Sequence, residues 1–408
     1  MAGLQLVLFD DAVARTWMPF TLTRPAGELR FGALTLRARA EHFAGVPCAG
    51  HLTDPQLDGF AEPGTAPVIR LRILDDARPR LFLSTRAVPD AGARFREPAT
   101  SGAVRVGAAV TGWYAAASAA APDASFFDDP ASANGEAVVE APGSVLGALW
   151  HIVTRNGARL CDDLASGSLG LPAAADPPAG TGVIGHSAGT LRMAQDATIE
   201  PGVVLDFTEG PICLDRGAQI RAFTRLAGPA YVGAGSVVLG GSCADISVGP
   251  VCKVHGELEA CVILGYTNKA HDGFLGHAML GCWVNLGALT TNSDLKNNYG
   301  TIRMWTPAGE VDTGEQKLGC FLGDHVKTGI GLMLNTGTVV GAGSNLFGAI
   351  QPPKYVPPFR WGSGERLVPY ELDRFLDTAR AVLKRRGVAL DDRMRAMLER
   401  AWQRAQTG

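Results

Sequence analysis

The sequence predicts an α/β domain followed by a parallel β-helix and a pair of C-terminal helices. Short apolar runs alternate with helical stretches before residue 170, apolar side chains then recur every six residues, and two amphipathic stripes follow Pro369. Strands that alternate with helices indicate an α/β domain, and a period of six is typical of a solenoid. We expect domains at residues 1–170 and 183–350, a proline-rich linker at 171–182, and a two-helix extension at 351–408.

The first domain contains several predicted elements. The compact apolar run Leu4–Phe9 predicts a buried parallel strand. Thr35–Phe43 has the composition and spacing of a helix, and Val68–Leu74 and Arg80–Ser84 are predicted strands. Val145–Asn156 is predicted to be an amphipathic helix. Together these segments predict a sheet with helices packed against it.

The second half of the chain carries the six-residue period. Each hexad is expected to form one flat strand with its aliphatic side chain inside and a small residue at the corner, so that three hexads close one triangular coil. The alternative, a glycine-rich β-sandwich, would need this spacing to arise by chance. The positions predicted to point inward are Ile220, Leu226, Val232, Val238, Ile246, Cys252, Leu258, Leu264, Phe274, Leu280, Leu286, Leu322, Thr328, Leu334, Val340 and Leu346.

Composition excludes several classes of function. A formal net charge of −3 gives no reason to expect nucleic acid as a partner. No run of eighteen apolar residues occurs, so no membrane span is expected, and the first residues lack the basic start of a secretory signal. The eight cysteines are scattered without a CxxC pair, which predicts reduced thiols and a cytoplasmic location.

The segment Gly265–Tyr299 is the densest source of chemistry, because it places polar residues where aliphatic ones would suffice for a solenoid. A neutral histidine such as His271 can remove a proton from an amine as it attacks a thioester. The same side chain could instead tie down a coil corner. The polar residues are Asn268, Lys269, His271, Asp272, Asn285, Asn292, Asn297 and Asn298.

A zinc site is a further alternative. The γ-class carbonic anhydrases bind zinc between subunits of a β-helix, and they need three histidines in convergent positions. Four histidines raise this possibility here: His255, His271, His277 and His325.

The run AHDGFLGHAMLGCWVNLGALT resembles, without gaps, the acetyltransferase core of the bifunctional N-acetylglucosamine-1-phosphate uridylyltransferase/glucosamine-1-phosphate acetyltransferase family. It is more similar still to divergent bacterial relatives described as sugar nucleotidyltransferases, which share the motifs at Thr267–Gly276, Asn285–Tyr299, Gly323–Ile330 and Asn335–Gly348. The resemblance covers most of residues 183–365 and extends more loosely to Phe20–Glu41. It implies a Rossmann-like nucleotidyltransferase domain, a left-handed hexapeptide β-helix and a homotrimer.

The resemblance also implies a reaction: transfer of an acyl group, acetyl from acetyl-CoA, to an amino sugar or its phosphate in UDP-N-acetylglucosamine biosynthesis. Carried over by position, His271 is the catalytic base and Asn285 contacts the substrate, while Lys317 and Lys253 bind the sugar phosphate. Three positions depart from the family pattern and leave the acceptor open: Phe274 stands for a tyrosine, Ile330 for a serine, and Glu259 falls near a lysine that would have held phosphate. The other candidate substrate-binding residues are Lys269, Asn297 and Asn298.

The N-terminal domain lacks the family's phosphate loop. The family pattern there is L-A-A-G-x-G-T-R-M, whereas this chain reads LFDDAVARTWMPFTLTRP, with no glycine between Gly3 and Gly27. The residues left to bind a nucleotide or Mg²⁺ are Arg15, Arg24 and Arg30, and Asp10–Asp11 or Asp75–Asp76. Alternatively, Arg24 is a buried ion-pair partner in a domain that has lost the reaction. The rival overall function is a sugar-1-phosphate nucleotidyltransferase whose β-helix is only a trimerisation scaffold.

Overall fold

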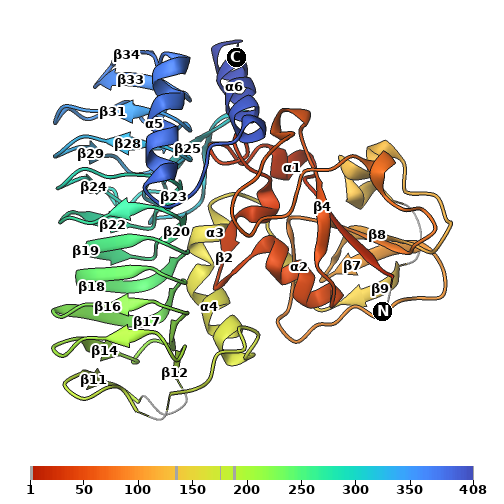
Figure 1. Ribbon diagram of the computed structural model, residues 1–408, viewed down its shortest axis with the longest axis horizontal. Helices are drawn as coiled ribbons and strands as arrows, with labels where there is room; N and C mark the ends of the chain where they lie inside the picture. Colours follow the sequence, from red (N-terminus) through yellow and green to blue (C-terminus); the bar gives the residue numbers. More distant parts are fainter. Residues whose placement is uncertain (1–2, 134–136, 175, 187–189, 408) are drawn as a thin grey trace.

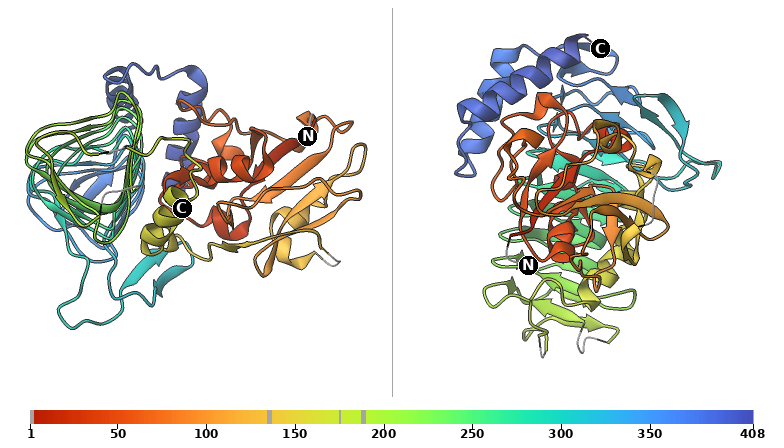
Figure 2. Two further views of the ribbon diagram at one scale, coloured as in Figure 1. Left: turned by 90° about the horizontal axis from the view of Figure 1, so that it is seen from below. Right: turned by 90° about the vertical axis from the view of Figure 1, so that its right-hand side faces the viewer.

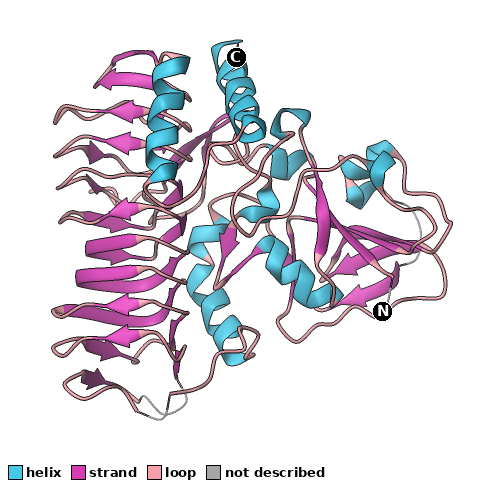
Figure 3. Ribbon diagram, in the orientation of Figure 1, coloured by secondary structure: helices cyan, strands magenta, loops and turns pink. Residues whose placement is uncertain are grey.

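The computed structural model describes residues 3–133, 137–174, 176–186 and 190–407. A tall β-solenoid forms one side of the molecule and the N-terminal domain forms the other, with two C-terminal helices at one end of the solenoid (Figure 1). The predicted order of an α/β domain, a parallel β-helix and C-terminal helices is confirmed. Figure 3 shows how strands dominate the solenoid, while helices lie between it and the N-terminal sheet.

The N-terminal domain is built on a six-stranded sheet of order β4-β1-β5-β8-β7-β9. Strand β1 pairs in parallel with both β4 and β5, and β8 then runs antiparallel to β5. The strands are β1 (Gln5–Phe9), β4 (Cys48–Leu52), β5 (Arg80–Ser84), β7 (Gly102–Val106), β8 (Ala109–Ala115) and β9 (Ala137–Ala141). The helices of this domain are α1 (Ala12–Arg15), α2 (Leu36–Ala44), α3 (His151–Thr154) and α4 (Asn156–Ala165).

Two predictions in this domain are wrong. Val68–Leu74 is not a strand, because only Val68 forms an isolated bridge and Leu71–Ile73 is a 3-10 helix with exposed side chains. Val145–Asn156 is not one helix: β10 (Gly143–Val145) precedes the single turn of α3, and α4 begins where the prediction ends. A longer helix does form, but in the residues that follow the predicted segment.

The solenoid has three faces, which Figure 2 shows nearly end-on. Face 1 contains β11 (Gly182–Ile184), β14 (Val204–Asp206), parts of β17 (Thr224–Val232), β18 (Val237–Val248) and β19 (Lys253–Glu259), then β22 (Phe274–Gly276), β24 (Thr291–Asn292) and β29 (Met333–Leu334). Face 2 contains β12 (Leu191–Met193), β15 (Ile212–Leu214), parts of β17 and β18, β20 (Val262–Gly265), β23 (Met279–Cys282), β27 (Phe321–Leu322), β30 (Val339–Val340) and β32 (Tyr355–Val356).

Face 3 completes each coil. It contains β13 (Thr198–Ile199), β16 (Gln219–Ile220), parts of β18 and β19, β21 (Asn268–Lys269), β28 (Lys327–Thr328), β31 (Asn345–Leu346) and β33 (Arg360–Ser363). The parallel coils therefore continue beyond residue 350. An insertion between β24 and β27 carries the hairpin β25 (Arg303–Thr306) and β26 (Gly309–Asp312). Strand β34 (Arg366–Pro369) folds back on β33 before α5 (Leu372–Lys384) and α6 (Asp392–Thr407).

Aliphatic side chains fill the solenoid as the hexad period predicts, with two exceptions. Leu264 and Phe274 do not point inward; the neighbouring Ile263 and Leu275 do so instead. The physical reason is a change in coil length, because Val248 pairs with Ile263 only fifteen residues later. A strict period of six cannot follow a coil that gains or loses residues at a corner.

The N-terminal domain packs on the outer side of face 2. Phe20, Leu29 and Phe31 from the N-terminal domain share one apolar core with Met279 and Phe321 from the solenoid. The two parts of the chain are therefore joined by a buried interface rather than by a linker alone. All eight cysteines are free, as predicted. Within the part of the chain that the structure describes, no helix is long and apolar enough to cross a membrane.

Candidate functional site

A groove of about 620 Å³ runs along face 1 of the solenoid, with helix α4 as one wall. Its floor comes from successive coils, so residues far apart in sequence lie one above another. Acidic side chains outnumber basic ones in its lining. The ionisable groups of the lining are Asp206, Glu209, Arg225, Asp245, Glu257, Glu259 and His277, with Cys161 on α4.

His277 and Asp294 form an oriented pair at one edge of this groove. The Nδ1 atom of His277 lies 2.8 Å from Oδ2 of Asp294, and both side chains are mostly buried. The contact with His277 lowers the pKa of Asp294, so this carboxylate stays ionised. Within the described residues, Nε2 of His277 has no hydrogen-bond partner. A histidine held at Nδ1 by a carboxylate presents Nε2 as a proton acceptor.

The local backbone explains why the pair forms. His277 follows β22 at a solenoid corner with φ of 47°, and Asp294 occupies the next coil, seventeen residues later. Gly276 leaves the necessary room, because a Cβ there would come within 2.4 Å of Oδ2 of Asp294. The pair was not predicted from the sequence. The signal that would have found it is the seventeen-residue spacing, close to one coil.

Two further carboxylates give the groove its charge. Asp245 sits at the same kind of corner, and burial raises its pKa to about 6. Its Oδ1 atom is buried without a hydrogen-bond partner among the described residues. Glu259 lies 3.4 Å from the Nζ atom of Lys317, which the insertion supplies. Lys317, a predicted phosphate ligand, is therefore at the groove but already beside a carboxylate.

His271 lies at the opposite end of β22 from His277, on the corner between faces 3 and 1. Its side chain is exposed, and among the described residues it has no side-chain partner and does not line this groove. Lys269 corrects one prediction: its side chain is 1% exposed and points into the coil, where Nζ donates to the carbonyl oxygens of His255 and His271. It cannot reach a ligand from that position, but it fixes the corner that presents His271.

The other predicted binding residues are distributed over two surfaces. Lys253 and Asn285 share one outward column on face 3, with Asn268 between them, and Nδ2 of Asn268 donates to Oδ1 of Asn285 over 2.9 Å. Asn297 and Asn298 lie in the exposed start of the insertion. The structure thus brings Lys253 and Asn285 together and separates both asparagines of the insertion from them.

The four histidines considered for zinc do not converge. His255 and His271 follow face 3, His277 follows face 1, and His325 is buried at the corner after face 2. Among the described residues, no group of three or more histidine, cysteine, aspartate or glutamate side chains is placed to hold a metal ion. Within one chain, the described histidines therefore do not form a metal-binding cluster.

The carboxylates proposed for Mg²⁺ do not fit that role. Asp10 accepts hydrogen bonds from Thr53 and Thr85, at 2.6 and 2.9 Å, and Asp11 accepts from Ser84 and Arg86, both at 2.8 Å. Both carboxylates are buried and satisfied by the fold, and burial raises the pKa of Asp10. The alternative pair, Asp75–Asp76, also has partners within the chain. Asp75 accepts a hydrogen bond from the backbone amide of Ala77, and Asp76 contacts Arg80.

The three arginines proposed for nucleotide binding all have partners within the chain. Arg15 contacts Asp128, and Arg30 donates to the carbonyl oxygen of Ala33 and lies over the ring of Tyr231. Arg24 is 2% exposed and bridges two buried carboxylates. A nucleotide would have to displace these contacts.

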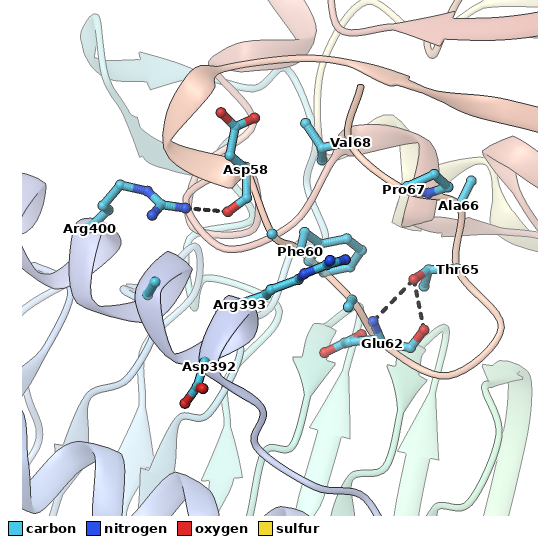
Figure 4. Close-up of a pocket in the computed structure, with 13 residues that line it drawn as sticks. Asp58, Phe60, Glu62, Thr65, Ala66, Pro67, Val68, Asp392, Arg393 and Arg400 are labelled. Carbon is cyan, nitrogen blue, oxygen red and sulfur yellow. Dashed lines mark hydrogen bonds between the residues drawn. The ribbon is translucent and has the colours of Figure 1, made fainter. Parts of the chain in front are cut away.

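A second cavity, of about 660 Å³, lies between the loop at 58–68 and helix α6 (Figure 4). Arg400 donates to the carbonyl oxygen of Asp58, while Thr65 and Glu62 hold the loop through two hydrogen bonds. Arg393 and Phe60 also line this cavity. The cavity lies at the contact between the N-terminal domain and the C-terminal helices, remote from the groove on face 1.

Comparison with known proteins agrees with this architecture. Residues 6–169 match the profile of a family described as sugar nucleotidyl transferase. The chain is 28% identical over 91 residues to a bifunctional sugar-1-phosphate nucleotidylyltransferase/acetyltransferase of Sulfurisphaera tokodaii, covering 22% of this chain and 23% of that protein. It is 29% identical over 138 residues to the bifunctional protein GlmU of Burkholderia vietnamiensis, covering 28% and 29%. The resemblance stated from the motifs is thus confirmed, as a divergent one.

These matches span less than a third of the length of either relative. Among solved structures, an Arabidopsis UDP-N-acetylglucosamine acyltransferase overlaps 53% of this chain and 78% of its own, at 11% identity and a TM-score of 0.24. That overlap is too weak to transfer a site. The groove therefore has to be interpreted from its own residues.

Proposed function

We propose that the solenoid transfers an acyl group, acetyl from acetyl-CoA, to the amine of an amino sugar. The observation that carries this proposal is the His277–Asp294 pair, whose free Nε2 belongs to a histidine that lines an acidic groove. The motif resemblance and the two curated relatives support the reaction class. The proposal also places the chain in the supply of sugar nucleotides such as UDP-N-acetylglucosamine.

The residues of the groove suit an amine acceptor. An ammonium group is attracted by Asp245 and Glu259, and it must lose a proton to the solvent before its nitrogen can attack. As the nitrogen attacks the thioester carbonyl, Nε2 of His277 takes the second proton that the nitrogen releases, and Asp294 stabilises the imidazolium. The C–N bond forms, the C–S bond breaks, and the leaving thiolate takes the proton from the His277 imidazolium, which restores the neutral base. The products are an amide and a free thiol.

The charge of the groove also selects among acceptors. The resemblance allowed either an amino sugar or its phosphate, and Glu259 falls near the position of a phosphate-binding lysine in the family. A carboxylate at that position repels phosphate, and Lys317 is already paired with it. We therefore expect an amino sugar that carries no phosphate near the groove.

For His271, we propose a role in a site that is shared with another copy of the chain. His271 is exposed on the corner that also presents Leu289 and Ile330, two apolar side chains that are 57% and 71% exposed. Three copies packed along this corner would cover those side chains and enclose His271. In that homotrimer, His271 would act in an intersubunit site, as the resemblance implies.

A pair of variants tests which histidine acts. Release of free thiol from acetyl-CoA is measured with glucosamine and related amino sugars as acceptors. We expect His277→Ala to lower kcat by about 10²–10⁴, the usual effect of removing one general base, while the melting temperature stays within about 2 °C. The control is His186→Ala, an exposed histidine before the second strand of the solenoid. Loss of activity in His271→Ala alone would transfer the role to His271, and unchanged activity in both variants would refute the proposal.

The family profile over residues 6–169 supports a second candidate, a sugar-1-phosphate nucleotidyltransferase whose solenoid only assembles the protein. It predicts pyrophosphate release from a nucleoside triphosphate and a hexose 1-phosphate in the presence of Mg²⁺, with no thiol release from acetyl-CoA. The two assays on one preparation separate the two functions.

A further inference from the structure

A smaller cavity, of about 250 Å³, lies on the other side of the solenoid, between the corner that joins faces 2 and 3 and the end of helix α5. Three cationic side chains line it: Lys327 from the solenoid, and Arg385 and Arg386 from the helix end. No carboxylate is among its lining residues. Its charge is thus opposite to that of the groove on face 1.

Lys327 forms the floor of this cavity. Its Nζ atom donates to the carbonyl oxygens of Trp283 and His325, which leaves one of the three ammonium donors unused. Burial lowers the pKa of Lys327 to about 7, and only Asp324 opposes this effect. A bound anion would restore the full charge of this lysine.

The two arginines are free to bind. Among the described residues, no hydrogen bond or ion pair involves the guanidinium groups of Arg385 or Arg386, although Arg374 and Arg380 on the same helix are each paired with an acid. Guanidinium groups bind phosphate oxygens through parallel hydrogen bonds. Arg385 and Arg386 are therefore two uncommitted cations at the mouth of one cavity.

Neutral donors complete the lining. The Oδ1 atom of Asn285 accepts from Asn268, so the Nδ2 group of Asn285 keeps its donors. Tyr266 and Trp283 are stacked with ring centroids 4.2 Å apart and form an aromatic wall. The cavity is rich in donors, and its volume of about 250 Å³ accommodates one or two phosphate groups.

We propose that this cavity is a binding site for a phosphate or pyrophosphate group, clamped between Lys327 on the solenoid and Arg385 and Arg386 at the C-terminal end of α5. The group belongs either to free pyrophosphate or to a small phosphorylated sugar. The proposal does not rest on acyl transfer, because the groove on face 1 and this cavity share no lining residue. It gives the C-terminal helices a role in ligand binding.

Isothermal titration calorimetry at low ionic strength tests the proposal, with inorganic pyrophosphate in one arm and a hexose 1-phosphate in the other. We expect binding in at least one arm, weakened at least tenfold in the Arg385→Gln/Arg386→Gln double variant. The matched control is Arg374→Gln/Arg380→Gln, which removes the same charge from the same helix outside the cavity and should bind normally. The stronger arm identifies the source of the phosphate group.

Lys327→Met provides a second test. The substitution removes a desolvated charge and adds none. The circular dichroism spectrum should therefore match that of the wild type, while the affinity for the phosphate probe falls. Two outcomes overturn the proposal: no heat of binding in either arm, or an equal loss of affinity in the control double variant. The second outcome would show a general attraction of anions to a basic helix.

Discussion

Arg24 and Asp324, three hundred residues apart in sequence, form a buried ion pair of 2.8 Å that joins the N-terminal domain to the solenoid. The other side of the Arg24 guanidinium contacts Glu62, whose Oε1 also accepts from the indole of Trp283 at 2.8 Å. Asp324 in turn accepts from the backbone amide of Cys282. Desolvation opposes the charged form of Arg24, but the two carboxylates outweigh it and raise its pKa. Arg24, which was predicted from the sequence to bind a nucleotide, therefore lies at the centre of the interface between the N-terminal domain and the solenoid.

The first prediction concerns this network. Arg24→Ala should lower the free energy of unfolding by about 3–5 kcal/mol, because it leaves two carboxylates buried without their partner. Arg15→Ala is the control, since its ion pair with Asp128 is solvent-exposed and should contribute less than about 1 kcal/mol. Urea denaturation measures both. A stable Arg24→Ala variant with weakened UTP binding would instead restore the nucleotide-binding role.

The second prediction is a pH dependence at Asp245. Because its pKa is raised from 3.8 to about 6, the folded protein holds a proton there that the unfolded chain releases. Stability therefore falls as pH rises from about 4 to 6, and the full cost is present above pH 6. Asp245→Asn should raise the free energy of unfolding by about 1–2 kcal/mol at pH 8, after allowance for solvent screening, and by almost nothing at pH 4. If the proposed acyl transfer is right, this gain in stability should come with weaker amine binding.

Thermal melts at both pH values measure this effect. Asp196→Asn, which removes an exposed carboxylate from another solenoid turn, should show no such difference between the two conditions. An equal gain for Asp245→Asn at pH 4 and pH 8 would mean that packing, rather than ionisation, is responsible.

The third prediction tests the homotrimer. Light scattering should report about three times the chain mass of 42.7 kDa, and Leu289→Asp/Ile330→Asp should convert the protein to monomers, because buried carboxylates on the shared corner would be desolvated. Ile73→Asp is the control: Ile73 is equally exposed, but it lies on the N-terminal domain. A wild-type monomer at micromolar concentration would refute both the trimer and the intersubunit role of His271.

The solenoid was predictable because each coil repeats one simple rule, an aliphatic side chain inward every sixth residue. The rule failed at Leu264 and Phe274, where coil length changes, since local pattern carries no record of how many residues turn a corner. The rule also did not predict that Lys269, which lies in a polar run, points inward and donates to the carbonyl oxygen of His271. Orientation at a strand end depends on register, which only pairing with the next coil decides.

The interfaces were not predictable in the same way. Arg24 meets Asp324 only after the two domains have packed, and no spacing in the sequence encodes that contact. The cavity beside Lys327 likewise requires α5 to fold back onto the solenoid. His277 and Asp294 are an intermediate case, because their spacing of seventeen residues is close to a coil length and so was visible in principle.

The last prediction is that the N-terminal domain releases pyrophosphate from UTP and a sugar 1-phosphate slowly or not at all. In sugar nucleotidyltransferases, a glycine-rich loop after the first strand lets backbone N–H groups reach the triphosphate. Here β1 passes directly into α1, and Asp11 caps that helix by accepting from the amide of Ala14 at 3.0 Å. The carboxyl edge of the sheet is thus closed by Asp10 and Asp11, which are both satisfied by neighbouring side chains. Each lost donor to a transferring phosphoryl group costs about 10²–10³ in rate, so the loss of several should leave little turnover.

The measurement is pyrophosphate release with purified protein, Mg²⁺, each nucleoside triphosphate and several hexose 1-phosphates. Asp11→Asn is the informative variant, because it frees Arg86 from its buried ion pair and offers a guanidinium to a phosphate at this edge. We expect wild type and variant alike to stay near background, since one side chain does not replace a backbone cradle. Release at several turnovers per second by the wild type would show that the domain keeps its reaction through a phosphate site made of side chains. In that case, Arg86→Ala and Arg24→Ala would test which of the two arginines binds the phosphate. Only Arg86→Ala leaves the ion pair between Arg24 and Asp324 intact.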